Sequence, residues 1–419
     1  MGVDWDRSWL DAPALRTVLD VLNAPDGASQ IQTRVVGGAV RDALLGQAPS
    51  GDSGSDIDLA TTAPAETVSM LAEAAGLKAV PTGIAHGTVT VVCEGKPFEV
   101  TTLRRDVETH GRRATVAFGA DWVEDARRRD FTMNALYADR HGRLYDPVGG
   151  YDDVFAGRVR FIGDPDTRIR EDFLRILRFF RFQAQYGRGD PDAAGLGAVI
   201  RERHGLLGLS AERLRQEMLR LILARRAWPT VEVMAETGIL GIVTGGVAYL
   251  ETFARYRAIE AAGGDEPDAI LRLATLCVAV PEDAERLAGR LRLTNAERNR
   301  LVATASGWRT ITPALSDHDR VERLYRTGRS TLLDRAHLSF ARSGSAADDP
   351  DWRALTADIR DREVPLFPVT GADLIGLGLA SGPRVGTVLA TLEAQWMDAG
   401  FTTDRDTLLQ RAAALIQRS

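Results

Sequence analysis

The feature that most constrains the fold is a change of pattern partway along the chain. Residues 31–145 contain short β-branched or alternating runs bounded by turn residues, among them TRVVGG, SDIDLAT, GTVTVVC, FEVTTL and GRLYDPVGG. From about Asp166 onward the strand signal fades, and Ala, Leu, Arg and Glu recur at helical spacing, as in SAERLRQEMLRLILARR. These patterns predict an α+β protein with a small mixed sheet and helices first, and an all-α remainder.

Charge is unevenly distributed along the chain. The 419 residues carry a formal net charge of −6, but residues 151–230 hold 15 Arg and no Lys against 11 acidic residues. A basic middle in an acidic chain predicts a confined anion-binding surface. The two cysteines are far apart, and no apolar run approaches the about 18–20 residues of a membrane-spanning helix. We therefore expect a cytoplasmic protein with no membrane contact.

The segment VVGGAVRDALLG (35–46) predicts a strand, a tight turn and a helix. Gly37 and Gly38 would let backbone N–H groups approach an anion, and the start of a helix favours negative charge. Arg41, one turn into the helix, could then meet a phosphate. A plain glycine turn with a surface arginine is the alternative.

The segment SDIDLAT (55–61) follows closely and carries two aspartates. Asp56 and Asp58 are two apart, so on a strand they point to the same face and repel each other unless a cation lies between them. Carboxylate oxygens beside a triphosphate suit Mg²⁺. Glu99, in FEVTTLRRD, is the candidate third carboxylate. The alternatives are a solvated aspartate pair and an exposed strand glutamate.

Two further segments combine arginine with aspartate. In RRRDFTMNAL (127–136), Arg129 could hold a phosphate and Asp130 could accept from a ribose hydroxyl, or both could flank a capped helix. In IREDFLRILRFFRF (169–182), a charged stripe runs through an apolar helical pattern at three-residue steps: Asp172, Arg175, Arg178 and Arg181. The pattern predicts one helix, on which the first two share a face.

Taken in order, GGAVRD, DIDLAT, RRRDFTMNAL, DPVGGYDDV, FIGDPDTRIREDFLRILRFFRF and LSAERLRQE resemble the bacterial-type (class II) tRNA nucleotidyltransferase and poly(A) polymerase family. The matching motifs are concentrated between about residues 34 and 217. The resemblance implies a polymerase-β-like nucleotidyltransferase head (1–146), a neck that recognises the base (147–228), a helical body (229–342) and a helical tail that binds tRNA (343–419).

The resemblance also implies an activity and its residues. The enzyme would add C, C and A to the 3′ end of tRNA from CTP and ATP, with Mg²⁺ and no template. It would meet tRNA at the acceptor end and elbow, with no obligate protein partner. Asp56 and Asp58 match the metal-binding pair, and Glu99 occupies the position of the third carboxylate. The implied nucleotide contacts are Gly37, Gly38, Arg41, Arg129, Asp130, Asp172, Arg175, Arg178 and Arg181.

Base choice has a physical explanation. Cytosine and adenine both present an amino donor beside a ring-nitrogen acceptor, whereas uracil and guanine present the reverse. Asp172 as acceptor and Arg175 as donor would match cytosine and adenine. Uracil and guanine would leave both side chains unpaired, and a site rejects a substrate strongly when its polar groups are left unpaired.

Two alternatives stay open. One is a poly(A) polymerase or a partial enzyme that adds only CC or only A. The segment 104–127 looks full length, unlike that of CC-only relatives, and the chain lacks the basic C-terminal extension usual in the polymerases. The other is a non-catalytic RNA-binding protein.

Overall fold

The computed structural model describes residues 5–23, 31–47, 49, 57–83, 87–110, 113–119 and 121–417, without the side chains of 105–110 and 113–118. Asp56 lies outside the described residues. The chain divides into two compact units, Met1–Gly245 with Arg290–Arg292, and Gly246–Gly289 with Leu293–Ser419. The predicted four domains are a finer division and stay a prediction.

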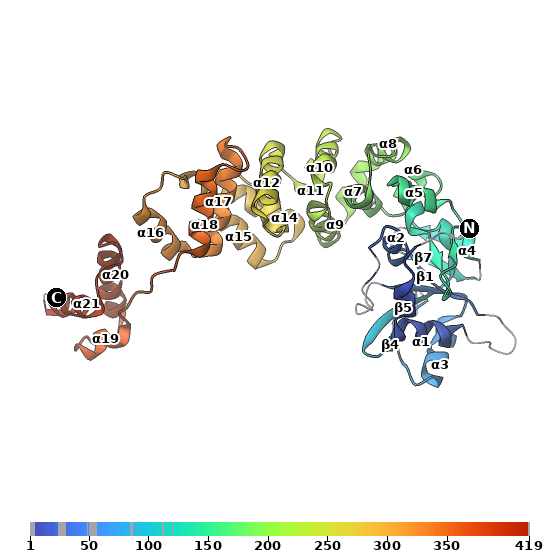
Figure 1. The fold of residues 1–419 in the computed structure, drawn as a ribbon, viewed down its shortest axis with the longest axis horizontal. Helices are drawn as coiled ribbons and strands as arrows, with labels where there is room; N and C mark the ends of the chain where they lie inside the picture. Colours follow the sequence, from blue (N-terminus) through green and yellow to red (C-terminus); the bar gives the residue numbers. More distant parts are fainter. Residues whose placement is uncertain are drawn as a thin grey trace. The chain divides into compact units, whose positions relative to one another are not determined.

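The first unit contains a seven-stranded mixed sheet (Figure 1). The strands lie in the order β3-β4-β5-β2-β1-β8-β9, with β2 and β5 parallel and the other neighbours antiparallel. They are β1 (Thr33–Val36), β2 (Asp58–Thr61), β3 (Lys78–Gly83), β4 (Thr88–Cys93), β5 (Lys96–Thr102), β8 (Tyr137–Ala138) and β9 (Leu144–Tyr145). A separate hairpin joins β6 (Arg104–His110) to β7 (Arg113–Phe118).

Buried and exposed residues alternate along the strands, and the buried ones form the core of this sheet. On β5, Phe98 and Val100 are buried and pair with the buried Val91 and Val89 of β4. Glu99, between them, points to the opposite face and is exposed. Helices α1 (Pro13–Leu22) and α3 (Ala65–Ala74) pack against each other and against β4. One face of the sheet is therefore apolar and covered.

Helices make up the rest of the first unit. Those around the sheet are α2 (Gly38–Leu44), α4 (Trp122–Arg127), the 3-10 helix η4 (Thr132–Asn134) and α5 (Gly150–Ala156). Those that follow are α6 (Pro165–Glu171), α7 (Leu174–Tyr186), α8 (Ala193–Glu202), α9 (Ala211–Leu223), α10 (Ala227–Glu236) and α11 (Ile239–Thr244). Phe179 of α7 stacks on Phe161, 5.6 Å between ring centroids, so apolar residues anchor α7 as predicted.

The described residues of the second unit form helices joined by turns and loops, with no strand among them. Its helices are α12 (Leu250–Gly263), α13 (Ala269–Cys277), α14 (Pro281–Leu291, as far as Gly289), α15 (Asn295–Ala305), α16 (Asp317–Thr327), α17 (Arg329–Ser343), α18 (Pro350–Asp361), α19 (Gly371–Gly376), α20 (Pro383–Asp398) and α21 (Arg405–Gln417). Phe340 stacks on Trp352 and joins α17 to α18. Another cluster, around Leu392, Trp396 and Leu408, forms a small core of its own.

The predicted α+β class, with a mixed sheet followed by helices, is confirmed. One expectation within it is wrong, because the segment 169–182 is not a continuous helix. α6 ends at Glu171, Asp172 has an extended backbone (φ −154°, ψ 105°), and α7 begins at Leu174. Phe173 is the N-cap residue of α7, and Asp172 Oδ1 accepts the backbone N–H of Leu174 at 3.1 Å, so this side chain satisfies one of the free N–H groups at the start of the second helix. None of the described helices has the length and apolarity needed to cross a bilayer.

Candidate active site

The turn between β1 and α2 carries the glycine pair. Gly37 has φ +78° and ψ −127°, a conformation that is open to glycine and closed to residues with a Cβ. Its N–H donates to the carbonyl of Leu136 at 3.1 Å, which fixes the turn against β8. Gly38 then begins α2, and a Cβ there would lie 3.4 Å from the Arg41 guanidinium.

Arg41 is buried, with 5% of its surface exposed, so the predicted alternative of a plain surface arginine is wrong. Its Nε and Nη2 donate to the two carboxylate oxygens of Asp42 at 2.9 and 3.0 Å. Nη1 donates to Asn134 Oδ1 at 2.5 Å, and Nη2 also donates to the hydroxyl of Tyr186 at 2.6 Å. The guanidinium therefore joins three segments that are distant in sequence.

The sheet aligns two of the three predicted carboxylates. Asp58, the first residue of β2, is the parallel partner of Glu99 on β5. Both are exposed, while Leu59 and Val100, the next pair, are buried on the opposite face, so the two carboxylates share one face of the sheet. Asp56 falls outside the described residues. Among the described residues no cluster of three or more His, Cys, Asp or Glu forms a ready metal site.

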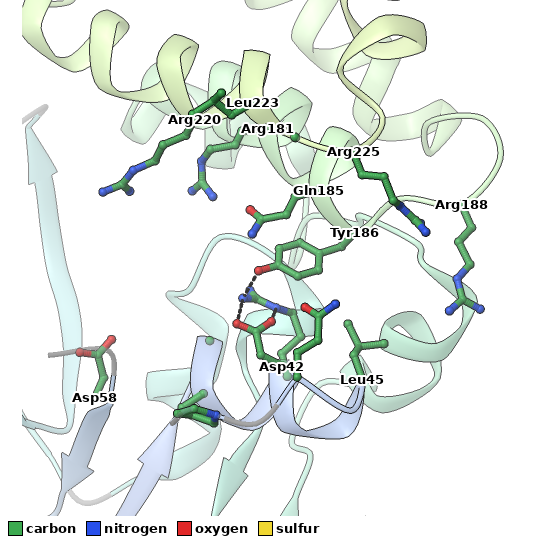
Figure 2. A pocket seen from close by; sticks show the side chains of 16 residues that line it. Asp42, Leu45, Asp58, Arg181, Gln185, Tyr186, Arg188, Arg220, Leu223 and Arg225 are labelled. Atoms are coloured by element: carbon green, nitrogen blue, oxygen red, sulfur yellow. Dashed lines mark hydrogen bonds and ion pairs between the residues drawn. The ribbon is translucent and has the colours of Figure 1, made fainter. Parts of the chain in front are cut away.

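A cleft of about 1090 Å³ lies beside Asp58 and within the first unit (Figure 2). Of the predicted site residues, Gly38, Arg41, Asp58 and Arg181 line it. Its ionisable lining is mainly cationic, with the arginines at positions 41, 181, 188, 220 and 225 against the aspartates at 42 and 58. Such a cleft suits a polyanion whose phosphates meet guanidinium groups on one wall and a carboxylate-bound cation on the other.

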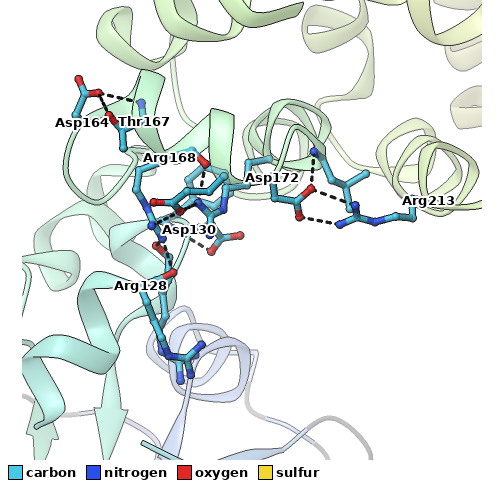
Figure 3. A network of polar contacts seen from close by, with 12 residues as sticks. Arg128, Asp130, Asp164, Thr167, Arg168, Asp172 and Arg213 are labelled. Atoms are coloured by element: carbon cyan, nitrogen blue, oxygen red, sulfur yellow. Dashed lines mark hydrogen bonds and ion pairs between the residues drawn. The ribbon is translucent and has the colours of Figure 1, made fainter. Parts of the chain in front are cut away.

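The neighbouring predicted residues form a second set, a network of polar contacts (Figure 3). Asp130 accepts from Arg178 Nε at 2.7 Å and from Asn134 Nδ2 at 3.1 Å. Burial alone would raise the pKa of Asp130, but the Arg178 charge and these hydrogen bonds hold that pKa below its usual value. Asp130 is therefore an ionised acceptor at neutral pH.

Arg129 is held in a similar way. It pairs with Asp125 at 3.1 Å, and its Nε lies 3.2 Å from the Tyr137 hydroxyl. Burial opposes the charge on Asp125, yet the adjacent Arg129 and Arg128 keep the pKa of that carboxyl low. One guanidinium nitrogen of Arg129 also comes within 3.9 Å of where a Cβ of Gly37 would lie, so Arg129 and the glycine turn are neighbours.

Asp172 and Arg175 do not pair with each other. Asp172 forms a two-pronged ion pair with Arg213 of α9, at 3.1 and 2.7 Å (Figure 3). Arg175 Nη1 donates to Glu171 at 2.5 Å and to the carbonyl of Arg168 at 2.6 Å. The expectation that a single helix face aligns them is wrong because the backbone leaves the helix at Asp172.

Arg178 and Arg181 share an acidic partner that the sequence interpretation missed. Glu217 of α9 is buried and pairs with Arg181 at 2.5 Å and with Arg178 at 3.8 Å. Glu217 and Arg213 both lie in the LSAERLRQE segment. The charges in that segment recur at a helical spacing, and this spacing was the sequence feature from which these two partners could have been predicted. Tyr186 carried no signal of this kind.

Comparisons with known proteins agree in the family that they indicate. Residues 33–160 match the family model described as the poly A polymerase head domain, and residues 196–248 match the probable RNA and SrmB-binding site of polymerase A. The mitochondrial CCA tRNA nucleotidyltransferase 1 of Danio rerio is 33% identical over 91% of this chain and 87% of its own length. A CCA-adding enzyme of Geobacillus thermodenitrificans is 40% identical over 50% of each chain.

A solved structure has the same fold. The crystal structure of the Bacillus stearothermophilus CCA-adding enzyme in complex with CTP superposes with a TM-score of 0.72 and 25% identity, over 97% of this chain and all of that one.

Proposed function

The chain belongs to the family of CCA tRNA nucleotidyltransferases and poly(A) polymerases, and on that premise we propose that it adds C, C and A to the 3′ end of tRNA. CTP and ATP are the nucleotide substrates and pyrophosphate is released. The observation that carries this function is the alignment of Asp58 with Glu99 on one sheet face beside an arginine-lined cleft, in a chain with a CCA-adding relative along 91% of its length.

Asp56, Asp58 and Glu99 are the proposed Mg²⁺ ligands. Their oxygen donors fit this hard cation, and Asp58 and Glu99 are themselves exposed on one sheet face, where substrate phosphates can add further ligands. Bound Mg²⁺ supplies charge neutralisation at the phosphates and a lower pKa of the attacking 3′-hydroxyl. The chain's own part is to hold the primer end and the nucleotide in line for attack on the α-phosphate.

The arginines of the cleft are the proposed phosphate contacts. Gly38 and Arg41 line the cleft, and Gly37 precedes them in the turn that lies next to Arg129. Arg181, which lines the opposite part of the cleft, is held by Glu217. Guanidinium groups that are already fixed lose little conformational entropy when a triphosphate binds.

Asp172 and Arg175 are the proposed readers of the base edge, and Asp130 is the proposed ribose contact. A carboxylate offers about four acceptor sites and a guanidinium five N–H donors. The Asp172 carboxylate uses some of its acceptor sites for Arg213 and the Leu174 N–H. Arg175 uses one nitrogen, Nη1, for Glu171 and the Arg168 carbonyl. Both side chains therefore keep capacity for cytosine and adenine while their positions are fixed. Recognition of the tRNA elbow by residues 343–419 and a cytoplasmic location complete the proposal.

One assay tests the function. The full chain is incubated with Mg²⁺, tRNA lacking its 3′ CCA, and labelled CTP and ATP singly and together, and the products are sized. Three added residues support CCA addition. A ladder of A would indicate a poly(A) polymerase, addition of only CC or only A a partial enzyme, and no addition a non-catalytic RNA-binding protein.

A further inference from the structure

Tyr186, the last residue of α7, contacts the predicted nucleotide site without belonging to any of its motifs. Its hydroxyl accepts from Arg41 Nη2 at 2.6 Å (Figure 2). Its ring centroid lies 3.9 Å from the central guanidinium carbon of Arg41, within cation–π range. The side chain is half-buried at the cleft wall. Tyr186 thus holds Arg41 by its hydroxyl and by its ring.

These contacts are part of a closed ring of five residues. Arg41 donates to Asn134 at 2.5 Å, and Asn134 donates to Asp130 at 3.1 Å. Asp130 accepts from Arg178 at 2.7 Å, and Arg178 lies on α7, as Tyr186 does. Helix α7 is therefore attached at two points to the segments that carry Arg41 and Asp130. We call this set, Tyr186, Arg41, Asn134, Asp130 and Arg178, the five-residue ring.

The donors of Arg41 are nearly all in use. Of its five N–H groups, Nε–H and one on Nη2 bind Asp42, the other on Nη2 binds Tyr186, and one on Nη1 binds Asn134. The second N–H on Nη1 has no partner among the described residues and is available to a ligand. Its direction is set by the other four bonds, because the guanidinium is planar and rigid.

We infer that Tyr186 is a positioning residue of the nucleotide site: its hydroxyl closes the five-residue ring and so orients the remaining Arg41 N–H toward the nucleotide phosphates. This inference rests on the proposed role of Arg41 as a phosphate contact. Burial raises the pKa of Tyr186 to about 12, with Arg41 opposing and Asp42 adding to the rise, so the hydroxyl stays neutral throughout the working range.

Tyr186→Phe in the full chain tests the inference, because it removes the hydroxyl and keeps the ring. We expect the Kd for CTP with Mg²⁺, measured by calorimetry, to rise about 5- to 10-fold, the loss of one hydrogen bond to a charged group. The KM values for CTP and ATP should rise together while kcat stays within about 2-fold, since the contact is made equally before and during reaction. The melting temperature should stay within about 2 °C.

A double-mutant cycle separates positioning from packing. In an Arg41→Ala background, Tyr186→Phe should have no further effect on the Kd for CTP. Tyr151→Phe, in α5, is the matched control, because its ring packs on Phe155 and its hydroxyl bonds to no described residue. It should bind CTP as the wild type does.

An unchanged Kd in Tyr186→Phe, or an equal loss in the Arg41→Ala background, would overturn the inference. A wild-type chain that binds CTP but adds nothing to tRNA contradicts the proposed function alone, and the Kd comparison still decides the role of Tyr186. A wild-type chain that does not bind CTP overturns both.

Discussion

Arg41, Arg178 and Arg181 each contact an acidic or amide side chain within the protein itself. Their partners are Asp42 and Asn134, Asp130, and Glu217. Arg41 and Arg181 are buried and Arg178 is half-buried, and a guanidinium removed from water is costly without such a partner, so these pairs permit the burial. The same pairs leave each cation with a fixed orientation, which favours binding of a rigid array of phosphates.

Asp58 gives the sharpest test of the metal assignment. Replacing Asp58 or Asp56 by Ala is expected to lower CCA addition at least about 100-fold, because metal catalysis contributes several kcal/mol and tenfold in rate is 1.36 kcal/mol. tRNA binding, measured by filter retention, should change little. Glu73→Ala, an exposed carboxylate on α3, is the control. Retention of more than a few per cent of CTP incorporation would contradict the assignment.

Asp172 and Arg175 determine base choice in our proposal. Asp172→Ala or Arg175→Ala should raise incorporation of UTP and GTP relative to CTP and ATP by about 10-fold or more, since the wrong bases no longer leave buried groups unpaired. Competition assays with labelled nucleotides measure this ratio. Arg170→Ala removes an exposed ion pair with Glu202 and should leave selectivity unchanged. Unchanged discrimination in both site variants would refute the pairing scheme.

At the scale of elements, the contacts of Asp172 explain the interruption between α6 and α7. Asp172 accepts the Leu174 N–H and pairs with Arg213, so its carboxylate stabilises the start of α7 and ties α7 to α9. The backbone turns out of the helix to allow both contacts. The charged stripe is thereby divided, with Asp172 at a helix junction and Arg178 and Arg181 within α7.

The start of α5 depends on a close backbone approach. A Cβ on Gly150 would lie 2.0 Å from the carbonyl oxygen of Thr132, whereas Gly149 has open space and φ +75°. Gly150→Ala should cost about 3 kcal/mol of stability or more, and Gly149→Ala only about 1 kcal/mol from its left-handed backbone. Urea unfolding of both variants measures the difference. Equal losses would show that η4 moves freely away from α5.

At the scale of the whole molecule, two compact units with different titrating groups are expected to respond differently to pH. Burial lowers the pKa of His337 in the second unit, with Arg360 adding to the effect and Asp265, Asp334 and Glu260 opposing it. In the first unit, burial alone would raise the pKa values of Asp125 and Asp130, but their arginine partners hold both below the usual value. These shifts act in separate pH ranges.

The sign of each effect follows from proton uptake. The unfolded chain protonates His337 near pH 6.5 while the folded chain does so only at lower pH, so the second unit should lose stability as pH falls below about 6.5. The ionised Asp125 and Asp130 stabilise the first unit above about pH 4, and this contribution is lost below it. Calorimetric scans from pH 8 to 3 should show that the second unit loses stability at a higher pH than the first.

His337→Gln should abolish the change between pH 7 and 5, and His141→Gln, an exposed histidine of the first unit, should not. A second unit whose stability is constant across this range would contradict the assignment to His337.

Much of the fold and part of the site could be predicted from local patterns. Alternation on β5 places Glu99 opposite the buried Phe98 and Val100, and the Gly37–Gly38 pair marks a turn before a helix. These properties depend on side-chain size and backbone freedom within a few residues. Motif order predicted the family, which the comparisons confirm.

Only the tertiary structure decided which residues meet. The register that aligns Asp58 with Glu99 depends on parallel pairing of strands about 40 residues apart. Asn134 and Tyr186 approach Arg41 from 93 and 145 residues away. The sequence by itself therefore determined the elements and the charges available to the site. Long-range packing decided their partners, because a buried charge must find its counter-group wherever the folded chain brings one.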